Sequence, residues 1–181
     1  MFTDVYLGAT KIKSIFNGST LIINNSSKDS KMKTVLIYGT SANFDLGLTH
    51  VVITKADGVV IKSSDISSCG ELSFNLGGGG IIKKYNIPNY LNTLNSSNLV
   101  SLYQHSSNTA VALFYVFQEP QDIKSISVNI KTYSGAYTLD IAYSAKDCYS
   151  ENAINYPNDI ITLKSFSFGS SPSSNTAKWA K

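Results

Sequence analysis

Beyond Thr34, the chain contains short runs rich in β-branched and aromatic residues, several of which alternate apolar with polar positions, and turn residues separate these runs. Alternation puts every second side chain on one face of an extended strand, whereas a helix needs a repeat of about 3.6 residues. The runs occupy residues 34–39, 49–62, 71–80, 109–118, 123–133, 136–145 and 159–168. This pattern predicts an all-β fold, an antiparallel β-sandwich of the jelly-roll type.

Two turns and one central strand can be placed within this pattern. The Ala-Asp-Gly sequence at 56–58 separates two β-branched segments and predicts a hairpin, and the Ser-Gly pair at 134–135 predicts a second tight turn. Residues 109–118 are apolar on both faces, which is typical of a central strand covered on each side. Asp140 lies on an alternating strand, and we expect its side chain to face solvent.

Composition favours one packed domain with a short appendage and disfavours several classes of partner. The chain has 181 residues, of which 43% are hydrophobic, enough for a sizeable core. None of its 15 basic residues is arginine, the residue that forms bidentate contacts with phosphates and guanine, so we expect no nucleic-acid partner. The longest apolar run, 110–117, is far shorter than the roughly 20 residues of a membrane helix, and the first residues lack a secretory pattern. We therefore expect no membrane association and synthesis in a cytoplasm.

The sequence shows no arrangement typical of an enzyme, a metal site or a cofactor site. His50 is expected at a strand edge and His105 in a polar loop, and neither accompanies a nucleophile motif. Cys69 and Cys148 lack metal-ligand spacing; two buried free thiols are favoured, with a disulfide formed after release from the cell as the alternative. The glycine run at 77–80 lacks the Gly-Lys-Ser/Thr ending of a phosphate loop, so we expect it to permit a bend or a close subunit approach.

The segment 5–22 contains the pattern aromatic-x-Gly-small-Thr-x-Ile twice, ten residues apart. The two glycines suit turns with positive φ, and the spacing suggests that both aromatic residues lie on the same side as both isoleucines. The expected product is a small β-arch or hairpin with one apolar face. Such an element is too small to be stable alone in water, so its face must be covered by its own sandwich or by a different protein.

A polar stretch at 24–33 follows this repeat and has no apolar periodicity. Such composition is typical of a linker, and a linker would be unnecessary length if the repeat only completed the sandwich. We therefore predict an attachment element at 1–23, a linker at 24–33 and a β-sandwich domain at 34–181. The alternative is a first strand pair packed on its own domain.

The opening repeat resembles a short element that begins many bacteriophage virion proteins of tails, fibres and head appendages. The residues that carry the resemblance, and the expected attachment residues, are Tyr6, Gly8, Lys11, Ile12, Phe16, Gly18 and Ile22. The resemblance implies a non-enzymatic virion structural protein (head fibre, decoration protein, collar or tail component), assembled in the bacterial host cytoplasm. Its implied partners are other virion proteins and sister subunits in a homo-oligomer, a trimer if the protein is a fibre.

A second resemblance covers "TAVALFYVFQEPQDIKSISVNIKTYSGAYTLDIAYSAKD", which is similar to a discoidin-like or galactose-binding-like jelly roll, without an obvious calcium loop. In such modules ligands meet the loops at one end, so the implied alternative function is a carbohydrate-binding module for a host or mucosal glycan. Tyrosine beside Asn and Ser suits sugar stacking, although subunit interfaces also favour tyrosine and that interpretation ranks first. The candidate glycan-binding residues are Tyr85, Tyr90, Tyr103, Tyr149 and Tyr156, all expected in loops, and Trp179 in the tail.

Overall fold

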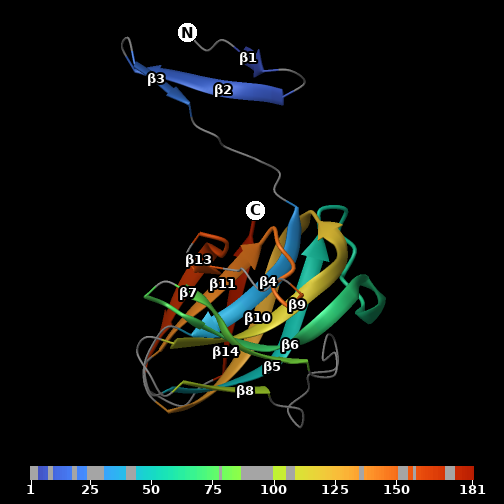
Figure 1. The fold of residues 1–181 in the computed structure, drawn as a ribbon, viewed down its shortest axis with the longest axis vertical. Coiled ribbons are helices and arrows are strands. Elements are labelled where there is room, and N and C mark those ends of the chain that lie inside the picture. The colour runs from blue at the N-terminus through green and yellow to red at the C-terminus, as the bar shows by residue number, and fades with distance from the viewer. Residues whose placement is uncertain are drawn as a thin grey trace. The chain divides into compact units, whose positions relative to one another are not determined.

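The chain forms two compact units, Met1–Ser30 and Lys31–Lys181 (Figure 1). The computed structural model describes residues 4–7, 10–17, 20–23, 31–39, 44–77, 79–86, 100–104, 109–134, 137–150, 155–156, 158–169 and 174–181. Within these residues the regular structure is β-strand together with one short 3-10 helix, η1 (Ser63–Asp65). Every pairing between described strands is antiparallel.

The first unit is a three-stranded antiparallel meander with strand order β1-β2-β3. Its strands are β1 (Asp4–Leu7), β2 (Thr10–Asn17) and β3 (Thr20–Ile23). Leu7 pairs with Thr10 and Asn17 pairs with Thr20. Two-residue connections, the shortest hairpin loops in common use, therefore join the three strands.

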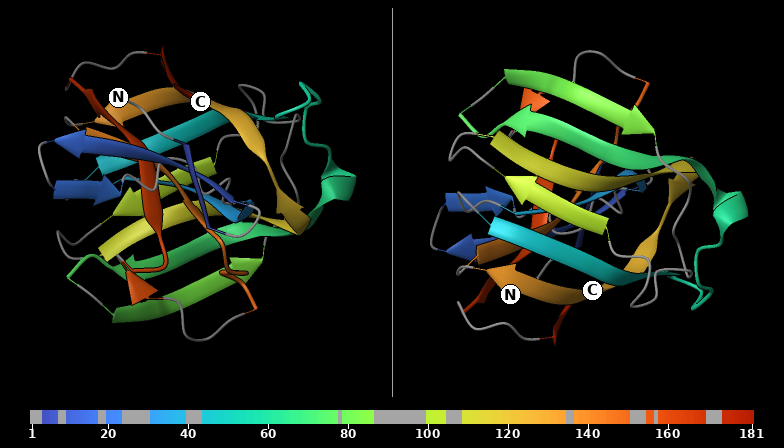
Figure 2. Two further views of the ribbon diagram at one scale, coloured as in Figure 1. Left: turned by 90° about the horizontal axis from the view of Figure 1, so that it is seen from above. Right: turned by 90° about the horizontal axis from the view of Figure 1, so that it is seen from below.

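The second unit contains two sheets. The four-stranded sheet, in the order β14-β10-β5-β8, consists of β14 (Ser174–Ala180), β10 (Ile123–Ser134), β5 (Phe44–Lys55) and β8 (Val100–Gln104). The seven-stranded sheet, in the order β12-β7-β6-β9-β4-β11-β13, consists of β12 (Asn155–Tyr156), β7 (Gly79–Asn86), β6 (Ile66–Asn75), β9 (Thr109–Gln121), β4 (Met32–Gly39), β11 (Tyr137–Ser144) and β13 (Ile161–Phe168). In both views of Figure 2, the segment with η1, between β5 and β6, projects beyond the strands.

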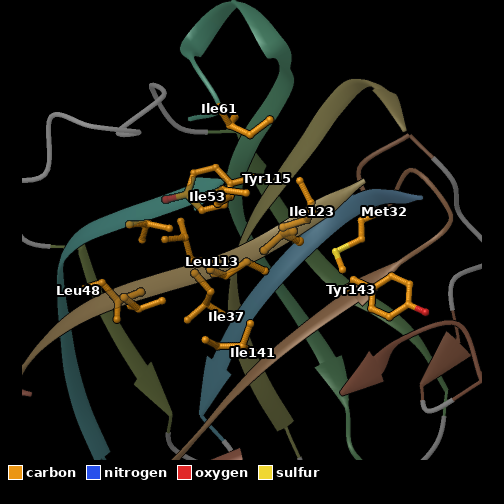
Figure 3. Close-up of a cluster of buried hydrophobic side chains, with 14 of the residues drawn as sticks. Met32, Ile37, Leu48, Ile53, Ile61, Leu113, Tyr115, Ile123, Ile141 and Tyr143 are labelled. Atoms are coloured by element: carbon orange, nitrogen blue, oxygen red, sulfur yellow. The ribbon is translucent and has the colours of Figure 1, made fainter. Parts of the chain in front are cut away.

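The two sheets pack face to face over a core that both supply, and the predicted all-β sandwich is confirmed. Figure 3 shows this core, in which Ile53 of β5 and Ile123 of β10 oppose Ile37, Leu113 and Ile141 of the larger sheet. The alternation predicted for β10 is confirmed, because Ile126, Val128 and Ile130 are buried. The partly buried side chains packed against this core are Val111, Leu163, Phe166, Phe168 and Trp179.

A second core lies on the other face of the seven-stranded sheet. It contains Phe114 of β9, Leu36 of β4 and Phe74 of β6, covered in part by Cys148 and Ile160 from the connection between β11 and β13. Residues 112–117 of β9 are all buried, and β9 lies between β6 and β4. The prediction of a central strand covered on each side is confirmed, because each face of β9 supplies one core.

Two strand boundaries differ from the sequence expectation. Strand β4 begins at Met32 rather than Thr34, because Met32 is buried in the inter-sheet core and pairs with Gln121. The tail predicted after residue 168 contains β14, which pairs with β10 and buries Ala177 against Val128. Its sequence, "SNTAKWA", is mostly polar, so alternation alone gives a weak strand signal.

The two predicted turns have different outcomes in the fold. At 56–58 the chain reverses direction after β5, as predicted. The residues that follow do not form a full second strand, and they pair with β5 at one position, the isolated bridge between Val60 and Thr54. At 134–135 the chain leaves β10 of the small sheet and continues as β11 of the large one. The second predicted turn therefore lies between strands of different sheets, and it does not close a hairpin.

Candidate functional site

The meander of the first unit has one strongly apolar face. Residues paired across antiparallel strands share a face, and successive residues alternate between faces. The register therefore places on one face the positions of Val5, Leu7, Thr10, Ile12, Ser14, Phe16, Leu21 and Ile23. The opposite face receives the positions of Asp4, Tyr6, Lys11, Lys13, Ile15, Asn17, Thr20 and Ile22.

The predicted grouping of attachment residues is wrong in part. Ile12 and Phe16 fall on the apolar face, but Tyr6 and Ile22 fall on the other, with Lys11. The reason is the length of the connections. Along one strand, residues with even numbers share a face, but a two-residue hairpin pairs an even-numbered residue with an odd-numbered one. The even-numbered residues of β2 therefore share a face with the odd-numbered residues of β1 and β3. Gly8 and Gly18 lie in the connections, outside the described residues.

Four residues of the apolar face are not defining positions of the repeated pattern and were not predicted: Val5, Leu7, Leu21 and Ile23. The short apolar runs "VYL" and "TLII" were the signal that could have found them. A sheet of three short strands is at the lower limit of independent stability, and its apolar face stays in water unless another structure covers it. The face is therefore the strongest candidate for a binding surface.

A second candidate surface lies at the end of the sandwich where the second unit begins and ends, called the terminus end below (Figure 1). Strand β4 starts there, since Met32 pairs with Gln121 at the corner between β9 and β10. The chain finishes there as well: the backbone N–H of Lys181 donates to the carbonyl of Lys124 at 3.0 Å, and its Nζ forms an ion pair with Asp122.

The hairpin at 55–60 belongs to the same end, because the backbone N–H of Ala56 donates to the carbonyl of Asp122 at 2.9 Å. Gly58 adopts a φ of 86°, which favours glycine, and its N–H donates to the carbonyl of Lys55. The carboxylate of Asp57 accepts the N–H of Val59 at 2.9 Å. These bonds hold the tip in one conformation with Val59 and Val60 exposed at its end.

Asp140 contradicts its predicted exposure to solvent. Its side chain on β11 is only 7% exposed, between Tyr38 of β4 and Ser165 of β13, which pair with it in register. Burial raises the pKa of Asp140, opposed by hydrogen bonds from Ser165 and Tyr38. Its Oδ1 atom has no hydrogen-bond partner among the described residues. The expectation failed because β11 has neighbouring strands on both sides and is covered on both faces, so alternation does not identify an exposed face.

The predicted glycan-binding residues lie in several different elements of the fold. Tyr85, Tyr103 and Tyr156 lie in strands β7, β8 and β12, which contradicts their expected place in loops; Tyr90 lies outside the described residues. Tyr149 lies in a turn, partly buried, and stacks on Phe114 with ring centroids 5.8 Å apart.

Trp179, expected in the tail, lies in β14 and packs against the inter-sheet core. The described candidates are thus distributed over both sheets, and glycan recognition stays a prediction.

The cysteines and histidines considered for catalysis or metal binding are the remaining candidates. Cys69 and Cys148 are free and buried, as predicted, and belong to different cores. His50 lies in β5 and pairs with Asn129, while His105 is outside the described residues. In the described part of the chain, no group of three or more His, Cys, Asp or Glu residues is arranged to hold a metal ion. The same residues include no helix of the length and apolarity that a membrane span requires.

Comparison with known proteins gives no match to a protein-family model, a curated protein or a solved structure.

Proposed function

We propose that this chain is a non-enzymatic structural protein of a bacteriophage particle, a head fibre, decoration, collar or tail component, attached through residues 1–23 and displaying the sandwich. The observation that supports the proposal is the apolar face of the meander, which contains six apolar positions in a sheet of three short strands. The resemblance of segment 5–22, which contributes Ile12 and Phe16 to this face, to an element that opens virion proteins supplies the class of partner.

The energetics favour attachment through this face. Full burial of one large aliphatic or aromatic side chain contributes about 1.5–3 kcal/mol. Six such positions correspond to about 9–18 kcal/mol, which is comparable with the roughly 4–15 kcal/mol that association costs in lost rigid-body freedom. Attachment is therefore favourable only when the partner covers most of the face, so the loss of any one apolar side chain has a measurable effect on binding.

The partners in this proposal are neighbouring virion proteins and sister subunits of a homo-oligomer, a trimer if the protein is a fibre. The apolar face can be covered either by a sister subunit or by a neighbouring virion protein. In both cases the same side chains are excluded from water. The sandwich does not need the meander for its own folding, because both sheets and both cores lie within residues 31–181.

The test compares two isoleucines of one strand. Ile12 and Ile15 both lie in β2, but the register places Ile12 on the apolar face and Ile15 on the opposite face. In the full-length chain, Ile12→Ser is expected to reduce incorporation into the phage particle at least about tenfold, since loss of one buried side chain of this size exceeds 1.4 kcal/mol. Ile15→Ser is the matched control and is expected to incorporate normally.

Deletion of residues 1–23 provides the stronger variant. The shortened chain is expected to keep the thermal transition and circular dichroism of the sandwich and to be absent from purified particles. Normal incorporation of the deletion variant, or equal loss with Ile12→Ser and Ile15→Ser, would refute attachment through this face.

A further inference from the structure

The terminus end of the sandwich holds the exposed large hydrophobic side chains found in the described part of the chain. These are Val59 (47% exposed), Val60 (38%) and Ile161 (49%). Ile161 begins β13, where it pairs with Tyr143, and Tyr143 pairs in turn with Val35 near the start of β4. Among the other residues of the second unit whose burial the structure describes, large apolar side chains are buried or partly buried. Val59 and Val60 are adjacent, and exposed apolar side chains that lie together are more typical of a contact surface than isolated ones.

The hairpin tip presents its two valines in a preorganised form. Lys55 donates its backbone N–H to the carbonyl of Val59 at 2.8 Å, and its ammonium group forms an ion pair of 3.2 Å with Asp65. Asp65 also accepts the backbone N–H of Lys62 at 2.8 Å, beyond the valines. The tip is thus bonded at both of its ends. A rigid apolar tip loses little conformational entropy on binding, which is the property that makes a small contact effective.

The surrounding charges are largely neutralised within the sandwich. Lys55 is paired with Asp65, and Lys181 is paired with Asp122. The carboxylate of Asp57 is directed to a backbone N–H of the tip itself. The carboxylate of Asp57 keeps its charge and Lys62 is exposed beside the tip, so Val59 and Val60 form a small apolar pair with charged neighbours. Such a tip suits a protein surface that offers an apolar patch with a polar border.

The chain itself determines which surface is available to the tip. Strand β3 ends at Ile23 and the sandwich begins at Lys31, at the terminus end. A fully extended chain spans at most about 3.3–3.6 Å per residue, so the eight residue steps from 23 to 31 reach at most about 29 Å. Any surface that holds residues 1–23 is consequently within about 29 Å of the point where the sandwich starts.

We propose that the Val59–Val60 tip makes a second contact with the same virion protein surface that holds residues 1–23. This inference rests on the proposed function. The tether keeps the tip at a high local concentration next to that surface, so a contact too weak to form alone forms readily, and the two contacts together bind more tightly than either. The terminus end then faces the particle, and the opposite end of the sandwich faces outward.

The test uses the buried state of the native thiols. Because Cys69 and Cys148 are buried, a Val59→Cys variant carries one accessible thiol, which a maleimide reagent can label selectively. Ser167→Cys is the matched control: Ser167 is exposed on β13, and it pairs with Thr138 close to the opposite end of β11. Both variants are labelled as free full-length protein and again in purified phage particles.

The expected result is rapid labelling of both variants in the free protein and a loss of at least about tenfold in the labelling rate of Val59→Cys in particles, with Ser167→Cys unchanged. Equal labelling of Val59→Cys in the two states overturns the inference. Protection of Val59→Cys already in the free protein also overturns it, because a second copy then covers the tip, and so does equal protection of both thiols in particles.

A second measurement separates this inference from the attachment proposal. The double variant Val59→Ser/Val60→Ser is expected to incorporate into particles through residues 1–23 but to dissociate at least about tenfold faster. An unchanged dissociation rate overturns the tip contact and leaves attachment intact. Failure of Ile12→Ser to affect incorporation overturns attachment itself, whatever the behaviour of the tip.

Discussion

Tyr115 and Tyr38 are both fully buried, but their hydroxyl groups have opposite surroundings. The hydroxyl of Tyr115 has no hydrogen-bond partner among the described residues, and Figure 3 shows its ring beside Ile53 and Ile61. Burial raises the pKa of Tyr115 well above its usual range, so the group stays neutral. The hydroxyl of Tyr38 lies 3.2 Å from Oγ1 of Thr162 and also bonds the carboxylate of Asp140. The same substitution, Tyr→Phe, should therefore have opposite effects at the two positions.

The magnitudes follow from the state of each hydroxyl. A buried polar group without a partner costs about 1–3 kcal/mol, and the void left by one oxygen atom offsets part of that gain, so Tyr115→Phe should stabilise the sandwich by about 1–2 kcal/mol. Tyr38→Phe removes a bond to a neutral hydroxyl and one to a buried carboxylate, a loss of about 2–4 kcal/mol. For a unit of this size about 2–4 °C accompanies each kcal/mol, so the melting temperature should rise by about 2–8 °C for Tyr115→Phe and fall by about 4–16 °C for Tyr38→Phe.

Differential scanning calorimetry of the full-length variants, with urea unfolding as a second measure, checks the prediction. Neither substitution changes ring packing, so the edge-to-face contact of Tyr38 with Phe74, at 5.1 Å between centroids, is preserved in the control. A fall in melting temperature for Tyr115→Phe would show that its hydroxyl is satisfied in the folded chain. Shifts of the same sign for both variants would refute the reasoning.

Three further outcomes can be measured on the same protein. Because burial raises the pKa of Asp140, the folded state binds the proton of this carboxyl more tightly than the unfolded state does. The cost of burying the ionised carboxylate is absent below the unfolded pKa of about 3.9 and fully present above the pKa of the folded state. In urea unfolding, Asp140→Asn should therefore gain stability relative to wild type as pH rises from about 3 to about 7. Gly58→Ala should lower stability by about 1–2 kcal/mol because of its positive φ, while Gly169→Ala, with equally open space around its Cβ, should be neutral in thermal melts. Cys69 and Cys148 should resist a thiol reagent in the native chain and react after denaturation, since they lie in different cores; a disulfide in the folded protein, seen by mass spectrometry, would contradict this.

The sequence was sufficient for the fold class and for the centre of the sandwich. Alternation identified β10, where Ile126, Val128 and Ile130 are buried as expected. An uninterrupted apolar run identified β9 as central, because a strand covered on both faces has no polar side. These features are local, since the period of a strand depends on its own backbone, and one sequence window contains the whole signal.

The sequence was not sufficient for positions decided by the pairing of strands. Asp140 follows an alternating pattern, but β4 and β13 on its two sides bury it. Tyr6 follows the same repeat as Phe16, but the two-residue hairpins place them on opposite faces.

Strand content and apolar periodicity can be read from the sequence, because both depend on residues that are neighbours along the chain. Which charged and apolar groups are covered, such as Asp140, and which are exposed, such as Val59, can be read only from the folded structure. Burial depends on the adjacent strands and connections, and these come from distant parts of the chain.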